Sequence, residues 1–343
     1  MPLLRIGLLT IIVIAFFTIP YVVSGDDIVF LKPNSTTRST TRVSGTIIDY
    51  TGRELLIRTV GSREQSIPTD RVEDIATKYT EKHAAADRLF EEHRYADAEA
   101  MYRRSITDEP RQWVRRMILS QVVWCLRNQD QYEQAAVTFA LIVQNDPTTQ
   151  YFDAIPLLWW STELPLSAER RATDWLRDES DPVMQLVAAS WLLRGPAELR
   201  GEAQRTIEAL TRSRDDRVAQ LAVAQSWRSR LVIAQASEVA RWQSIVQQFD
   251  PRLRAGGYFL IGQALARHRK LEEAALALMR VPVLYPRERE LAAESLLAAA
   301  DALEKNNNID ESRVALRELL RDHAGSNAAA AAKSKLQRNT TGG

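Results

Sequence analysis

Apolar residues recur with helical spacing through most of the chain, and one arrangement of them occurs twice between residues 95 and 147. Each copy has an aromatic residue, then a small residue, then a second aromatic residue and a terminal proline. The matched residues, 37 positions apart, are Tyr95 and Tyr132, Ala98 and Ala135, Tyr102 and Phe139, and Pro110 and Pro147. Self-similarity at this period predicts a stack of helical hairpins.

This pattern predicts two hairpins over residues 77–150. The first pairs helices at 77–92 and 95–108, and the second pairs helices at 113–129 and 132–144. Small residues allow the two helices of a hairpin to approach closely, and bulky residues at helical spacing fill the remaining space. A proline ends the second helix each time.

The pattern returns over residues 253–323. Residues 258–265 predict a first helix with Gly262 at a close-contact position, and residues 271–286 predict its partner. A further copy at 296–319 is offset by 38 residues. Within residues 324–343, the alanine-rich stretch 327–336 predicts a helix that caps the apolar end of the array, followed by a disordered tail.

These units resemble tetratricopeptide repeats, whose first helix mixes small and bulky residues and whose second carries tyrosine, alanine, an aromatic residue and a final proline. The copy at 258–286 has the best resemblance. The resemblance implies a mainly α fold, a right-handed solenoid of αα-hairpins, and a non-catalytic scaffold that binds another protein through its concave surface. The residues expected to pack the repeats are Ala86, Ala98, Tyr102, Pro110, Val123, Ala135, Phe139, Pro147, Gly262, Ala274, Leu278 and Pro286.

Residues 151–252 are helical in composition, but prolines interrupt the repeat. Segments 181–189 and 216–224 match at an offset of 35 residues, and each begins with an aspartate, a favoured residue at a helix N-terminus. We predict irregular helical repeats here, within one continuous solenoid, because no disordered linker separates them from the rest.

The period changes between residues 26 and 76, where short β-branched segments alternate with turns. Five strands are predicted, at 28–31, 42–48, 54–60, 65–67 and 72–75. Such short, sharply turning strands suit a small barrel, because closure removes open edges. The segment at 45–57 resembles Sm-like and Src-homology-type barrels. The module either caps the first helices or binds peptide or glycan.

Residues 1–25 contain one charged side chain, Arg5, followed by an apolar run and by small residues before Asp26. This order is typical of a secretory signal peptide. Residues 3–23 are also long enough to span a bilayer, so an uncleaved membrane anchor is a second interpretation. Either interpretation predicts a bacterial protein that is exported, being periplasmic or anchored in the inner membrane and facing outward. The third interpretation is a cytosolic protein with an apolar leader.

The charges are balanced, with 45 Lys and Arg against 44 Asp and Glu, and this argues against a nucleic-acid partner. The single cysteine, Cys125, lies in an apolar run and is predicted to be a buried small hydrophobe. The four histidines show no metal-binding spacing, and no phosphate-binding loop or nucleophile motif is present. We therefore predict no catalytic, metal or cofactor site.

Eight tryptophans are present, and Trp159, Trp160 and Trp175 lie in the irregular middle. Core packing is one interpretation, and an aromatic surface for a partner is the other. On a helix, neighbouring residues point about 100 degrees apart, so Trp159 and Trp160 would not both face one core. The alternative function is an envelope protein that binds peptidoglycan or polysaccharide through the β module and these tryptophans.

Overall fold

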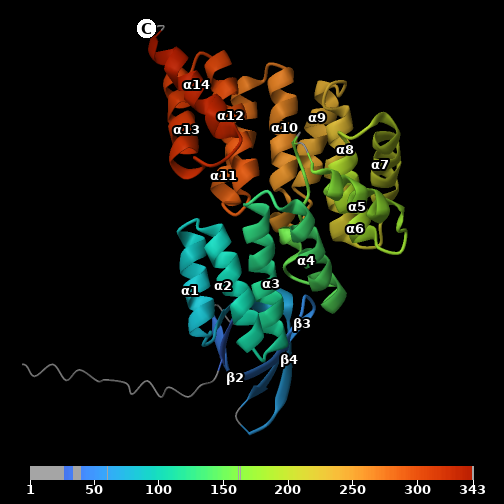
Figure 1. Ribbon diagram of the computed structural model, residues 1–343, viewed down its shortest axis with the longest axis vertical. Helices are drawn as coiled ribbons and strands as arrows, with labels where there is room; N and C mark the ends of the chain where they lie inside the picture. Colours follow the sequence, from blue (N-terminus) through green and yellow to red (C-terminus); the bar gives the residue numbers. More distant parts are fainter. Residues whose placement is uncertain (1–26, 34–39, 60, 161, 163, 342–343) are drawn as a thin grey trace, which may run out of the picture.

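The computed structural model describes residues 27–33, 40–59, 61–160, 162 and 164–341. Within these ranges the chain forms a five-stranded antiparallel sheet followed by 14 α-helices. Figure 1 shows the sheet beneath a first block of helices, α1–α4, with a second block, α5–α14, above it. The predicted signal or anchor lies outside the described residues. No helix within them is both long and apolar enough to cross a membrane.

The strands lie close to their predicted positions, but the predicted closed barrel is wrong. The sheet has the order β4-β3-β2-β1-β5, so β4 and β5 are its two edges. These edge strands are connected by a short 3-10 turn at Thr69–Arg71 rather than by a ladder of hydrogen bonds. The strands are β1 Asp27–Leu31, β2 Thr41–Tyr50, β3 Glu54–Thr59, β4 Glu64–Pro68 and β5 Val72–Ala76.

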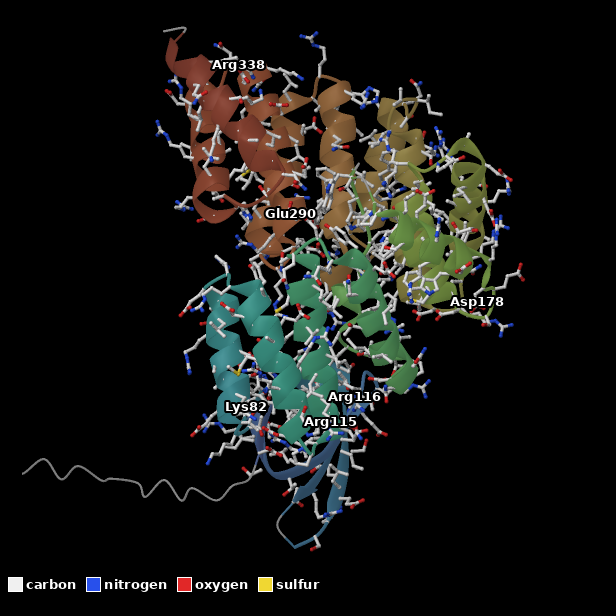
Figure 2. The ribbon with its side chains drawn as sticks, in the orientation of Figure 1. Lys82, Arg115, Arg116, Asp178, Glu290 and Arg338 are labelled. Carbon is white, nitrogen blue, oxygen red and sulfur yellow. The ribbon has the colours of Figure 1, made fainter. Side chains whose placement is uncertain are left out.

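The sheet is attached to the first block through polar contacts at one end. Arg116 forms an ion pair with Asp49 and donates to the Tyr50 carbonyl at 3.0 Å. Gly52 donates its N–H to Asp146 at 2.9 Å, directly after the last helix of the block. In Figure 2, Arg115 and Arg116 lie where the helices meet the sheet. The module therefore packs on the first helices, as the capping interpretation requires.

The first block consists of two antiparallel hairpins with the predicted pairing. Its helices are α1 Glu81–Glu91, α2 Tyr95–Asp108, α3 Gln112–Arg127 and α4 Tyr132–Asn145. Helix α1 begins four residues later than predicted, because the hydroxyl of Thr80 accepts the N–H of His83 and caps the helix there.

The second block ends with two hairpins of the same kind and a terminal helix. They comprise α10 Ala255–Arg267, α11 Leu271–Leu284, α12 Arg289–Lys305 and α13 Ile309–Asp322. The terminal helix α14, Ala328–Thr341, continues beyond its predicted end at Leu336 and packs on α12 and α13.

All four of these hairpins share one turn. Its distinctive residue has a positive φ of 57–64° and is His93, Asp130, Arg269 or Asn307. The N–H of the following residue donates to the carbonyl of a leucine five positions earlier, at 2.9–3.0 Å, and those leucines are Leu89, Leu126, Leu265 and Leu303. This is the Schellman ending of a helix, which satisfies terminal carbonyls. A shared turn geometry supports the interpretation of the four hairpins as copies of one repeat.

The middle of the chain is helical, but its hairpins lack that turn. Its helices are α5 Leu166–Arg177, α6 Pro182–Leu192, α7 Ala197–Leu210, α8 Asp216–Arg230 and α9 Ala236–Val246. The carboxylates of Asp181 and Asp215 cap α6 and α8. The capping residue of α8 is therefore Asp215, one residue before Asp216, the aspartate that the repeat offset predicted.

An irregular stretch, residues 146–160, runs between the two blocks, and we call it the central segment. Most of its apolar residues are buried although only Phe152–Ala154 forms a short 3-10 helix. Buried carbonyls outside regular structure need other donors. Arginines supply several of them, since Arg217 donates to Thr149, Arg252 to Gln150 and Arg228 to Leu158, at 2.8–3.0 Å.

The second block folds back onto the first. The connection between α11 and α12 places Glu288 beside Arg127 of α3, with 2.5 Å between Oε2 and Nη2. Arg289 lies over the ring of Tyr95 and 3.2 Å from Nε2 of His93. One hydrophobic cluster is continuous from the sheet to α12. The ends of the array are therefore in contact, as Figure 1 shows for α11 above α1–α3.

Candidate functional site

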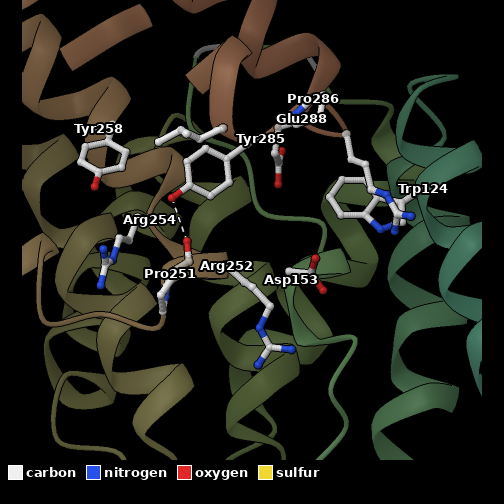
Figure 3. A pocket seen from close by; sticks show the side chains of 11 residues that line it. Trp124, Asp153, Pro251, Arg252, Arg254, Tyr258, Tyr285, Pro286 and Glu288 are labelled. Atoms are coloured by element: carbon white, nitrogen blue, oxygen red, sulfur yellow. Dashed lines mark hydrogen bonds between the residues drawn. The ribbon is translucent and has the colours of Figure 1, made fainter. Parts of the chain in front are cut away.

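A pocket of about 490 Å³ lies where the two blocks meet. Four parts of the chain form it: α3, the central segment, the stretch from the short 3-10 helix Pro251–Leu253 into α10, and the α11–α12 connection (Figure 3). Its lining residues are Trp124, Asp153, Pro251, Arg252, Arg254, Tyr258, Leu284, Tyr285, Pro286, Arg287 and Glu288. Because these four stretches come from both blocks and from the central segment, the pocket exists only when the second block contacts the first.

Aromatic side chains form rigid walls on two sides of this pocket. The Tyr285 hydroxyl donates to the Pro251 carbonyl at 2.7 Å, and its ring centroid lies 6.3 Å from that of Tyr258. Trp124 stands opposite and is held by the guanidinium of Arg127, 4.3 Å from its ring centroid. These contacts hold the rings in place, so their apolar faces are preorganised for a ligand.

Two carboxylates point into the space between those walls. Figure 3 shows Asp153 and Glu288 directed toward the same region, between Tyr285 and Trp124. Glu288 is paired with Arg127, whereas Asp153 makes no ion pair or hydrogen bond with another described residue. Burial raises the pKa of the Asp153 carboxyl against the opposing effect of nearby arginines. Burial raises the pKa of Glu288 as well, against the lowering effect of Arg127.

Three arginines lie at the border, and two of them are already engaged. Arg252 forms a two-pronged contact with Asp250 and donates to the Gln150 carbonyl. Arg254 donates to the carbonyls of Gln247 and Phe249. The exposed Arg287 makes no hydrogen bond or ion pair with another described residue.

A second group of carboxylates lies beside the pocket at the start of α12. Burial, followed by the charges of Asp130 and Glu294, raises the pKa of Glu290 to about 7. The Glu290 Oε2 atom is buried and has no hydrogen-bond partner. Figure 2 places this side chain where α12 faces the first block. Its ionised form is therefore unfavourable in the folded protein.

We expect Glu290→Gln to make the protein more stable at neutral pH. An acid whose pKa is higher in the folded state stabilises that state below its unfolded pKa, 4.5, and this contribution is lost as the pH rises to about 7. Allowing for partial exposure, the variant should gain about 1–2 kcal/mol at about pH 8 and nothing near pH 4.5. Urea unfolding at both pH values measures this. The exposed Glu272→Gln is the control, and an equal gain at both pH values would contradict the prediction.

The structure buries every predicted packing residue except the prolines. These buried residues are Ala86, Ala98, Tyr102, Val123, Ala135, Phe139, Gly262, Ala274 and Leu278. The close-contact position of Gly262 is occupied tightly, since a Cβ there would overlap the side chain of Leu278. Pro110, Pro147 and Pro286 are exposed and follow the ends of α2, α4 and α11. Pro286 also lines the pocket.

The three tryptophans proposed for partner binding do not form one surface. Trp159 is only 5% exposed and packs under Gly256, while Trp160 and Trp175 are half-buried. Trp175 instead packs edge to face with the buried Trp191. The helical argument about neighbouring tryptophans does not apply, because residues 155–160 form no helix.

Sequence reasoning did not identify the pocket. Its residues come from the repeat-like part, the central segment and a loop, and no local spacing connects them. The only local signal was the concentration of proline and arginine between residues 250 and 254 and again between 285 and 289. Cys125 is fully buried, as predicted, and burial raises the pKa of its thiol. The described residues contain no cluster of metal-ligating side chains.

Comparison with known proteins adds one match. No curated protein matches this chain. The family model of the tetratricopeptide repeat matches residues 294–326. This segment includes most of α12, all of α13 and the shared turn between them. It is the copy after the one whose residues resembled the repeat best, and over these residues the chain is similar to a tetratricopeptide repeat.

Proposed function

We propose that this chain is a non-catalytic scaffold that binds another protein, and that the pocket anchors the partner. The observation that carries the proposal is the pocket itself, which combines fixed aromatic walls, an unpaired carboxylate and an exposed leucine at the contact between the blocks. Pockets with apolar walls and a few polar groups are typical binding sites. The repeat match supports the same class of function, because stacked hairpins present extended surfaces to protein partners.

Leu284→Arg tests the position of this site. Leu284 lines the pocket and is 57% exposed, so a charge there should weaken partner binding without affecting the fold. We expect capture of the principal partner to fall at least about tenfold, because a charged arginine at an apolar contact must be desolvated. Quantitative mass spectrometry of proteins retained by the immobilised full chain measures it.

Leu166→Arg is the matched control, since Leu166 is also an exposed leucine, 71% accessible, but lies at the start of α5 away from the pocket. It should retain the partner. If both variants retain the partner equally, the binding surface lies outside the pocket. If the wild-type chain retains no protein above the level of blank matrix, the scaffold proposal is wrong.

Residues 1–25 are the basis for a proposal on location. We propose export, with either cleavage before Asp26 or anchoring by residues 3–23, because the segment has the charge and hydropathy order of a leader. Mass spectrometry of the mature N-terminus tests it, since recovery of residues 1–25 from a soluble fraction would contradict both forms.

The alternative of polysaccharide binding has no support from the tryptophans. It requires an exposed aromatic shelf, but all eight tryptophans lie in described ranges and each is buried or half-buried. The open sheet leaves the edges of β4 and β5 available for a peptide or glycan, but no contact favours either ligand.

A further inference from the structure

We propose that the pocket accepts a basic side chain, arginine or lysine, from the protein partner, with Asp153 as its counter-ion. This inference rests on the proposed scaffold function and specifies which chemistry the partner presents. The argument comes from the charges that the pocket leaves unpaired, from the walls around them and from the space available.

The carboxylate of Asp153 lacks a partner within the fold. It is half-buried in the pocket, and its carboxylate forms no ion pair or hydrogen bond with another described residue. Removing an ionised carboxylate from water without a partner is costly, so such a group is retained where something else binds it. The neighbouring Glu288 is affected as well, because the charge of Asp153 raises the pKa of Glu288 further. A cation between them would stabilise both carboxylates.

The arginines at the border do not turn the pocket into an anion site. The charge of Arg252 is matched by Asp250, and that of Arg127 by Glu288. The guanidinium of Arg254 donates its hydrogen bonds to two backbone carbonyls. Figure 3 shows the guanidinium groups of Arg252 and Arg254 turned away from the space between Tyr285 and Asp153. Arg287 is exposed, so water screens its charge. The charges of Arg252, Arg287 and Arg127 oppose the effect of burial on the pKa of Asp153, but burial has the larger effect and the pKa stays raised.

The walls suit a long basic side chain. Tyr285 stands on one side of the two carboxylates and Trp124 on the other, and Pro251 and Pro286 line the border. Aromatic faces attract cations, and the methylene stem of arginine or lysine packs on apolar rings while its charged end reaches a carboxylate. A volume of about 490 Å³ accommodates one such side chain with part of its backbone.

The test uses the full chain and short peptides that differ in one group. The probes are acetylated, amidated pentapeptides of sequence Gly-Ala-Xaa-Ala-Gly in which Xaa is arginine, citrulline, lysine, glutamate or glutamine. Citrulline has the shape of arginine without its charge, so the comparison isolates the ion pair. NMR titration gives the dissociation constants. We expect the arginine peptide to bind about tenfold more tightly than the citrulline peptide.

The matched variants are Asp153→Asn, which should abolish the arginine preference, and Asp178→Asn, an exposed aspartate bonded to Ser180, which should leave it intact. No saturable binding of the arginine peptide, no preference over citrulline, or a preference for glutamate overturns the inference. The citrulline comparison remains decisive if Asp153→Asn does not fold. If the arginine preference is absent while Leu284→Arg still lowers partner capture, only this inference fails and the scaffold function stands.

Discussion

Replacing Trp159 by alanine should lower the free energy of unfolding by about 3–5 kcal/mol. Trp159 is buried at the inner end of the central segment and touches Gly256 so closely that a Cβ on that glycine would overlap the indole ring. Removing a ring in such close contact leaves a cavity that the surrounding helices can fill only partly, because the segment is anchored on both sides. Arg228 and Gln225 hold the carbonyl of Leu158 at 2.8 and 3.0 Å.

Trp160→Ala is the matched control for this experiment. Trp160 is the same residue type at the next position, but it is half-buried, so its loss should cost less than half as much. Denaturant unfolding followed by circular dichroism gives both values. Equal losses for the two variants would show that the central segment does not form the core between the blocks.

Replacing Gly52 by alanine should destabilise the protein by about 3 kcal/mol, and the effect should be concentrated where the sheet meets the helices. A Cβ at Gly52 would overlap the backbone carbonyl of Thr148, which cannot rotate away as a side chain could. The shift would also break the hydrogen bond from Gly52 to Asp146. Hydrogen exchange should report faster exchange in β2 and β3 and at the end of α4.

Gly201→Ala is the control for the glycine substitution. In helix α7 the added Cβ would meet only the far end of Arg205, at 3.6 Å, and alanine is the better helix former. This variant should gain about 0.5–1 kcal/mol. A Gly52→Ala protein as stable as the wild type, with unchanged exchange in β2, would show that the sheet is not anchored at this point.

The repeat hairpins were predictable because their signals are local. Apolar spacing and terminal prolines placed α2 and α4 to within one residue at both ends, and α11 at its first residue and to within two residues of its last. The shared turn is also local, but its positive-φ residues are His93, Asp130, Arg269 and Asn307, none of them glycine. The absence of glycine therefore hid the turn from a reading of composition. Its leucine does recur at the repeat offset, because Leu89 and Leu126 are 37 positions apart and Leu265 and Leu303 are 38 apart.

The error about the barrel has a comparable cause. Strand propensity and turns identified the strands, but whether β4 pairs with β5 depends on sheet curvature and on what covers the sheet. Contacts between Arg116, Asp49 and Tyr50 are formed across more than sixty positions of sequence and have no local signature. Residues 151–160 of the central segment were likewise expected to belong to irregular helical repeats, because a run of buried apolar residues has the same composition in a helix and in an irregular stretch.

Hydrophobic spacing alone was thus sufficient to establish the helical hairpins, the strand-rich start of the described chain and the likeness to tetratricopeptide repeats, since each depends on contacts between neighbours in sequence. The pocket, the pairing of Arg127 with Glu288 and the isolation of Asp153 depend on the return of the second block to the first. That return joins positions more than 150 residues apart. Such contacts depend on the sum of the small rotations between successive hairpins, and no local spacing of residues encodes that sum.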